Sequence, residues 1–413
     1  MAGKTYLNLL SLLMLNRVYD SKTITIQCGN EIVASKYRKK LIEEGHAKKQ
    51  TLVLKEGKQR SVTIFTLTKK GFQFLTQHDK NITYALCTQD MGEDIPLKSD
   101  FETKATTKLR LIRRTKAITV ASKAGAMIPL ENYTIQNDGE ERDQDNDYSM
   151  SDYIAETLEE KDYHKIDPYR EKNVSKEFVF HTDAFIKQNA GAANKLTSVQ
   201  DSASGRYSGV ADSELKSILL YVAPVYGMSW TKWLAKREMP AFSIWTKTKA
   251  IASPEQLRRS GTCAALIVDN AKRFHDLYKN TDNAKVGEDA SFGDPFKHFY
   301  IIPADNYGVQ HLRWLLSTND DEINSSIMES AVDSGMYRKN TSFTPSLFPL
   351  LNADDEPVAI NFQFDAKHLQ RIESVATKNP STTFNLLCYD WQEDYYKRIL
   401  PTNINIIPLP MSN

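Results

Sequence analysis

The sequence has little cysteine and no long apolar run. Its four cysteines, Cys28, Cys87, Cys263 and Cys388, are far apart along 413 residues. This spacing fits neither a zinc site nor a disulfide framework, so we expect buried free thiols. No apolar run reaches the length of a membrane span, and the first residues lack the pattern of a signal peptide. We therefore expect a soluble, cytoplasmic protein that makes no membrane contact.

Several motifs of small-molecule chemistry are also missing. The sequence has no Gly-x-x-x-x-Gly-Lys-Ser/Thr loop and no strand-anchored Gly-x-Gly-x-x-Gly, which argues against nucleotide hydrolysis and dinucleotide binding. Its eight histidines are scattered and do not form the close cluster that a histidine-rich metal site needs. With 19 tyrosines, no single nucleophile stands out. We expect no cofactor, and Mg²⁺ only if the chain is an active nuclease.

Charge is abundant but unevenly distributed along the chain. Residues 1–130 contain 23 basic and 11 acidic side chains, a net charge of +12, whereas residues 131–172 contain 5 basic and 14 acidic ones, a net charge of −9. The near-neutral total of +1 therefore conceals a polarised molecule. A basic domain of this kind is typical of a nucleic-acid binder, because each neutralised phosphate releases counterions.

Helical patterns open the basic part of the chain. An apolar run over residues 6–18 predicts a first helix, and a short second element covers residues 23–28. A third helix then follows, with Val33, Tyr37 and Leu41 at i, i+4 and i+8 on the face expected to meet the core. Its other faces are basic.

Two alternating runs, over residues 49–54 and 60–67, predict a β-hairpin with a polar turn at residues 55–59. Thr68 and the residues after it predict the start of a final helix. Three helices, a hairpin and a capping helix in this order predict an α+β winged helix-turn-helix, whose third helix is free to enter a major groove of double-stranded DNA.

Basic residues of the third helix, of the hairpin turn and of a later helix over residues 108–119, Lys116 among them, would contact DNA in this arrangement. Charged helix faces are often merely solvated, and winged helices also dock proteins, so both alternatives stay open. The predicted DNA-binding residues are Ser35, Lys36, Arg38, Lys39, Lys40, Lys55, Lys58, Arg60, Arg110, Arg113 and Arg114.

Composition also predicts the domain organisation. We expect a winged helix domain at 1–80 and a basic helical extension at 81–136, with a second winged helix as the alternative for the extension. An acidic segment at 137–172 is too polar to bury a core, so we expect a flexible linker. A competing role for the linker is to mimic phosphate and cover the basic surface. Residues 173–413 form the C-terminal domain.

The C-terminal domain alternates strand and helix patterns. After a hairpin over residues 206–222, apolar runs predict buried strands and amphipathic runs predict helices between them. This alternation predicts an α/β domain with a mixed sheet. The predicted strands are 263–268, 298–302, 359–364, 383–389 and 405–409, and the predicted helices are 270–278, 309–316 and 366–376.

Short motifs in a fixed order resemble the replication-relaxation superfamily of plasmids and integrative conjugative elements, which includes MobC-type mobilisation proteins. The resemblance covers the chain up to about residue 316. It is carried by the winged helix, by the basic helix leading into residues 121–125, and by the segments Phe180-His181-Thr182-Asp183, Ser204-Gly205-Arg206-Tyr207 and Ile301-Ile302-Pro303-Ala304-Asp305-Asn306-Tyr307-Gly308. It implies action at a replication or transfer origin, partners such as a relaxase or replication and transfer proteins, and a homodimer. For the C-terminal domain it implies a restriction-endonuclease-like fold.

A nuclease of that fold needs carboxylates and a lysine on adjacent strands to hold a divalent metal. No Glu-x-Lys lies on the strands expected to carry it, which puts hydrolysis in doubt. Four acidic residues are weak catalytic candidates, and the simpler interpretation makes them turn and cap residues. These candidates are Asp183, Asp212, Glu214 and Asp269.

Three functions compete on this basis. The first is a DNA-binding protein of a mobile genetic element, which recognises duplex DNA through its winged helix and assembles a replication or transfer complex, such as a relaxosome for conjugation, through its C-terminal domain. The second is a metal-dependent nicking endonuclease at the transfer origin. The third is a winged-helix transcriptional regulator.

Overall fold

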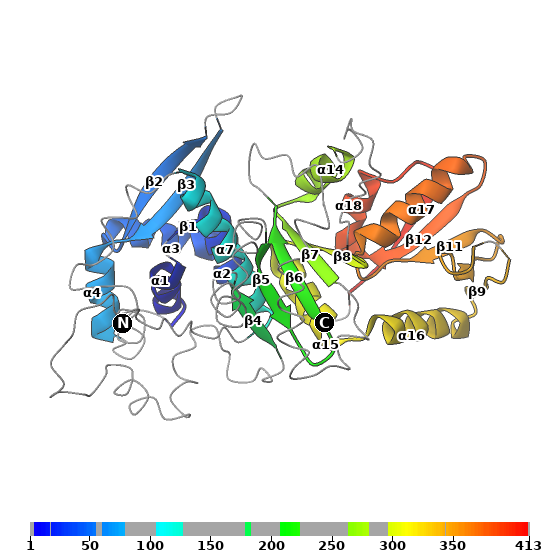
Figure 1. The fold of residues 1–413 in the computed structure, drawn as a ribbon, viewed down its shortest axis with the longest axis horizontal. Coiled ribbons are helices and arrows are strands. Elements are labelled where there is room, and N and C mark those ends of the chain that lie inside the picture. The colour runs from blue at the N-terminus through cyan, green and yellow to red at the C-terminus, as the bar shows by residue number, and fades with distance from the viewer. Residues whose placement is uncertain are drawn as a thin grey trace, which may run out of the picture. The chain divides into compact units, whose positions relative to one another are not determined.

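The computed structural model describes residues 4–16, 18–54, 60–78, 105–126, 178–182, 207–223, 263–280, 296–342 and 344–411. The chain divides into two compact units, residues 1–180 and 181–413, and each is described by itself (Figure 1). The predicted linker at 137–172 lies outside the described residues. Within these ranges, none of the helices combines the length and the apolar character that crossing a bilayer requires.

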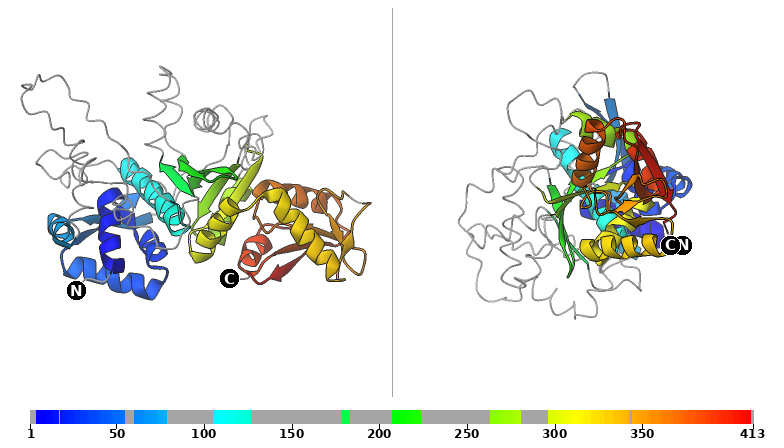
Figure 2. Two further views of the ribbon diagram at one scale, coloured as in Figure 1. Left: turned by 90° about the horizontal axis from the view of Figure 1, so that it is seen from below. Right: turned by 90° about the vertical axis from the view of Figure 1, so that its right-hand side faces the viewer.

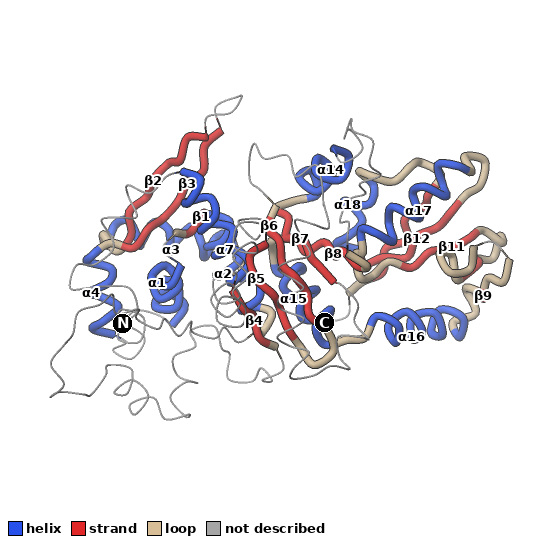
Figure 3. Tube along the Cα trace, viewed as in Figure 1, coloured by secondary structure: helices blue, strands red, loops and turns tan. Residues whose placement is uncertain are grey.

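The first unit consists of helices around a small antiparallel sheet (Figure 3). In this sheet β3 lies between β1 and β2 and is antiparallel to both. The hairpin follows the sequence pattern, because apolar and polar side chains alternate along β2 and β3. The capping helix begins where predicted, because the Thr68 hydroxyl accepts a hydrogen bond from the backbone N–H of Gly71. The elements are α1 (Lys4–Asn16), β1 (Tyr19–Asp20), α2 (Ser21–Cys28), α3 (Glu31–Glu43), β2 (Ala47–Leu54), β3 (Arg60–Leu67), α4 (Lys69–His78) and α7 (Ala105–Lys123).

The core of this unit is made by residues of α1, α2, α3 and α4 and of the three strands. Helix α3 contributes Ala34 and Leu41, both fully buried, with Tyr37 packed at the edge. The prediction that Val33 faces the core is wrong, since its side chain is 38% exposed. Each step of four residues turns about 40° around a helix, so Val33 lies about 80° from Leu41, whereas Ala34 lies only about 20° from it and shares the buried stripe.

Helix α7 packs against α2 and β1 and so belongs to the first unit (Figure 2). Every residue from 115 to 122 on it is buried. A helix predicted from its basic residues is therefore largely a core helix.

The first sheet of the C-terminal part has the order β4-β5-β6-β7-β8, and the boundary between the two units falls within β4. β5 and β6 form the predicted antiparallel hairpin, while β6, β7 and β8 are parallel. Helix α14 connects β7 to β8, as a parallel crossover requires. The bounds are β4 (Val179–Thr182), β5 (Tyr207–Asp212), β6 (Ser217–Val222), β7 (Cys263–Val268), α14 (Ala271–Asn280), β8 (His298–Pro303) and α15 (Asn306–Ser317).

A second sheet has the order β13-β12-β11-β10-β9. Its strands β11, β12 and β13 are parallel, and β10 and β9 continue it antiparallel. Residues of α16 pack against one face of this sheet, and α17 and α18 join the large core on the other. The bounds are α16 (Asp320–Asp333), β9 (Arg338–Lys339), β10 (Leu350–Leu351), β11 (Pro357–Ile360), α17 (Ala366–Lys378), β12 (Phe384–Tyr389), the 3-10 turn η1 (Asp390–Gln392), α18 (Glu393–Lys397) and β13 (Ile404–Leu409).

The expectation of a single mixed sheet is therefore wrong, and the strand predicted over residues 359–364 ends at Ile360. After Ile360 the chain turns, because the Asn361 side chain accepts from the backbone N–H of Asp365 and donates to its carbonyl. Phe364 adopts a φ of 53° in this turn. A bridge between Tyr300 and Asp365 links the turn to β8, and buried residues of both sheets pack in one core.

Candidate nucleic-acid interface

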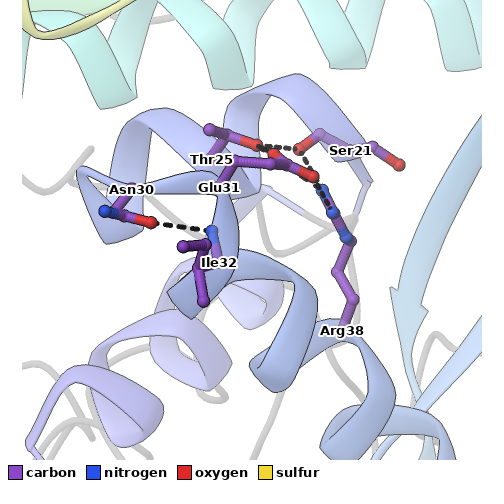
Figure 4. Close-up of polar contacts among 6 residues, drawn as sticks. All are labelled: Ser21, Thr25, Asn30, Glu31, Ile32 and Arg38. Carbon is purple, nitrogen blue, oxygen red and sulfur yellow. Dashed lines mark hydrogen bonds and ion pairs between the residues drawn. The ribbon is translucent and has the colours of Figure 1, made fainter.

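Helix α3 is positioned by a tight junction with α2. Gly29 ends α2 with a φ of 70°, a left-handed conformation that favours glycine. Asn30 then caps α3, with its side-chain oxygen 2.7 Å from the backbone nitrogen of Ile32 (Figure 4). Only these two residues separate the helices, so the first turn of α3 is held firmly at the end of α2.

The face of α3 opposite the core is exposed. Ser35, Lys36 and Lys39 all lie on it, as the sequence predicts. Lys39 lies 3.6 Å from Glu43 on the next turn, an exposed pair that contributes little stability and leaves the lysine available. Ile32 lies on the same face, one turn before Lys36, and is 80% exposed.

Arg38 lies at the side of α3 and its guanidinium makes contacts within the unit. It forms an ion pair with Glu31 and donates to the Ser21 carbonyl at 3.1 Å (Figure 4). The hydrogen bond from Arg38, aided by one from Thr25, lowers the pKa of Glu31. With its side chain 17% exposed, Arg38 links α3 to α2.

Lys40 also has an internal contact. Its ammonium lies 4.6 Å from the centre of the Tyr6 ring, a cation–π arrangement at the border of the core. Two of the five residues predicted on α3 therefore serve packing, and three lie on the open face.

The predicted basic surface of α7 differs from the expectation. Lys116, which the sequence pattern grouped with the exposed cations, is 1% exposed and lies 3.2 Å from Asp20. Arg113 and Arg114 are half-buried and interact within the chain. Arg110 lies on α7 and Arg60 begins β3, but their side chains are outside the described set.

The hairpin turn, with Lys55 and Lys58, lies outside the described residues, as does Asp183. Among the other carboxylate candidates, Asp212 ends β5 and accepts from Ser217, and Glu214 is exposed in the turn that follows. Glu214 and Lys216 match the Glu-x-Lys motif, but both lie in this turn and not on a strand.

Asp269 belongs to the same sheet but lies at the opposite end of its strands. It follows the end of β7, whereas Asp212 pairs with the start of β6, and β6 and β7 are parallel. Six residues of strand at about 3.3 Å each separate the two ends. The structure therefore does not bring Asp212 and Asp269 together. Within the described ranges, no group of three or more His, Cys, Asp or Glu side chains could hold a metal ion.

The sequence reasoning missed one polar pair in the second unit. The ring Nδ1 of His298 lies 2.9 Å from Asp365, whose other oxygen accepts from the backbone N–H groups of Phe299 and Lys367. Burial opposes its ionisation, but the contacts with His298 and Phe299 lower the pKa of Asp365. An Asp directly before an amphipathic helix is the signal of an N-cap that could have located it.

Comparison of the chain with family models, with curated proteins and with solved structures finds no match.

Proposed function

We propose that the first unit binds double-stranded DNA and that α3 is the helix that enters the major groove. The order α1-β1-α2-α3-β2-β3, with β1 paired to the hairpin, supports a winged helix-turn-helix arrangement. In that arrangement the second helix of the motif reads base edges while the first crosses the backbone. α2 and α3, joined through Gly29 and Asn30, take these two roles.

The observation that carries the proposal is the exposed cationic face of α3. Lys36 and Lys39 stand free of the core on a helix of 13 residues, about 20 Å long. An α-helix with its side chains is about 10–12 Å in diameter and fits the major groove, which is about 12 Å wide. The net charge of +12 over residues 1–130 supplies the long-range attraction to phosphate.

The internal contacts of Arg38, Lys40 and Lys116 refine this proposal. They hold α1, α2, α3 and α7 in one rigid block, so that α3 is presented on a fixed scaffold. A preorganised helix loses less conformational entropy on binding than a mobile one. Contact with DNA is therefore assigned to Ser35, Lys36 and Lys39 ahead of Arg38.

The role of this binding in replication or transfer of a mobile element stays a prediction from the resemblance. So do the partner proteins and the homodimer. In this proposal the second unit assembles the complex, and its two sheets and shared core make it a substantial rigid body for that purpose.

Charge reversal tests the proposal. We expect the 413-residue chain to bind a fluorescently labelled random-sequence duplex, and Lys36→Glu or Lys39→Glu to weaken binding about tenfold or more. Lys378→Glu is the matched control, because Lys378 is exposed in the last turn of α17 in the other unit. Equal losses for all three variants, or no binding by the wild type, would reject the assignment of α3.

A further inference from the structure

The first turn of α3 carries an apolar patch made of Ile32 and Val33. Among the large apolar side chains that the structure describes, Ile32 has the highest exposed fraction, 80%, and Val33 is 38% exposed. Neither residue is needed to start the helix, because Asn30 supplies the cap and Glu31 provides the acidic side chain favourable in a first turn. The patch thus lies on the capped first turn of α3, where it is needed neither for the core of the unit nor for the start of the helix.

Cations adjoin this patch on the same helix face. Lys36 lies one turn after Ile32, and Lys39 lies one turn further. A surface that combines apolar and cationic groups in this way fits a partner with an anionic rim and small apolar groups inside it. A DNA major groove has this character, since phosphates line its edges and the 5-methyl group of thymine is the apolar group on its floor.

The position of the patch on α3 matches the geometry of groove binding. Residues near the N-terminus of a recognition helix approach base edges most closely. Ile32 and Val33 occupy that position, and their branched apolar side chains offer no hydrogen bond to a guanine or an adenine. Arg38, the residue type best suited to a bidentate contact with guanine, is held by Glu31 and Ser21.

We propose that Ile32 and Val33 contact thymine 5-methyl groups, so that the DNA site of this protein has thymine where the first turn of α3 meets the groove. This inference rests on the proposed function. It adds a base preference to the attraction between the lysines of α3 and the phosphates.

Replacing thymine by uracil isolates the methyl group. Alternating dA-dT and dA-dU duplex polymers present the same hydrogen-bonding edges and differ in the 5-methyl group. We expect the 413-residue chain to bind the dA-dT polymer more tightly, by about fourfold for each methyl group buried. Ile32→Ala should reduce this ratio towards one, and Val33→Ala should reduce it in part.

Ile42→Ala is the matched control, because Ile42 is also an exposed apolar residue of α3, 39% exposed, but lies at the far end of the helix. It should retain the full preference for dA-dT. Equal affinity of the wild type for both polymers would overturn the inference and leave DNA binding intact. A preference that Ile32→Ala does not alter would also overturn it, and would favour a protein partner for the patch. Binding to neither polymer would reject the inference together with the proposed function.

Discussion

The Nζ atom of Lys116 lies 3.2 Å from the Oδ2 atom of Asp20, and the two side chains are 1% and 6% exposed. Asp20 also caps α2, because its other oxygen accepts from the Thr23 backbone N–H at 2.7 Å. One carboxylate therefore joins the N-terminus of α2 to the middle of α7. Since α2 positions α3, the buried pair contributes to the orientation of the proposed DNA-binding helix.

Breaking this pair should be costly. Lys116→Met leaves the Asp20 carboxylate buried without its cation, and we expect the free energy of unfolding to fall by about 3–5 kcal/mol in chemical denaturation followed by circular dichroism. Adding Asp20→Asn to that variant should recover part of the loss, because Asn is neutral and still caps a helix. If the double variant is less stable than Lys116→Met, the ion-pair explanation is wrong. Lys36→Met, on the open face of α3, should leave stability unchanged.

Arg38 and Lys36 should differ in their effects on DNA binding. Arg38→Gln removes the contacts with Glu31 and Ser21, so we expect a loss of stability of about 1 kcal/mol. Its effect on duplex affinity should be smaller than that of Lys36→Gln, which removes an available cation. Anisotropy titrations of both variants against one duplex give the comparison. An equal or larger loss of affinity for Arg38→Gln would show that its guanidinium leaves Glu31 to reach the DNA.

His311 should make stability depend on pH. Burial lowers its pKa to about 4, while its ring Nε2 lies 3.0 Å from the Gln363 carbonyl. Between about pH 6.5 and pH 4 the unfolded chain takes up a proton that the folded chain does not, so stability falls as the pH falls through this window. We expect a loss of up to about 3 kcal/mol from this group. Denaturation at several pH values should show a shallower dependence for His311→Gln, and parallel curves for the two proteins would contradict it.

Gly308 should not tolerate a side chain. A Cβ atom at this position would lie 1.7 Å from the Pro303 carbonyl oxygen, which is backbone and cannot easily move. We expect Gly308→Ala to reduce the free energy of unfolding by about 3 kcal/mol or more. Gly335 is the control, since its φ is 73° but nothing lies within 4 Å of a Cβ there. Gly335→Ala should cost only about 1 kcal/mol, and similar losses at both positions would contradict the steric argument.

Local patterns in the sequence predict most elements of this fold, but not how the strands pair. β3 has the bounds that its alternating pattern indicates, and β5 and β6 form the hairpin predicted over residues 206–222. The division of the C-terminal strands into two sheets depends on contacts between distant residues, such as the bridge from Tyr300 to Asp365. Such pairing leaves no periodic signal in either segment.

The candidate site was predicted in part for a similar reason. Residue type identifies cations, so Lys36 and Lys39 were located correctly on an exposed face. Residue type does not reveal a buried partner, and Lys116 was grouped with exposed cations because Asp20 lies far away in the sequence. An apolar residue on a helix is expected to face the core, so the sequence does not reveal that Ile32 is exposed.

The salt dependence of duplex binding tests the central claim most directly. Log affinity falls linearly as log salt concentration rises, and each phosphate neutralised by a lysine makes this slope steeper by about 0.9. If α3 contacts DNA through Lys36 and Lys39, the Lys36→Ala/Lys39→Ala variant should bind more weakly, and its slope should be shallower by about 2. Lys378→Ala should match the wild type. Wild-type and double-variant lines that run parallel would contradict the account, because they would show that neither lysine contacts a phosphate.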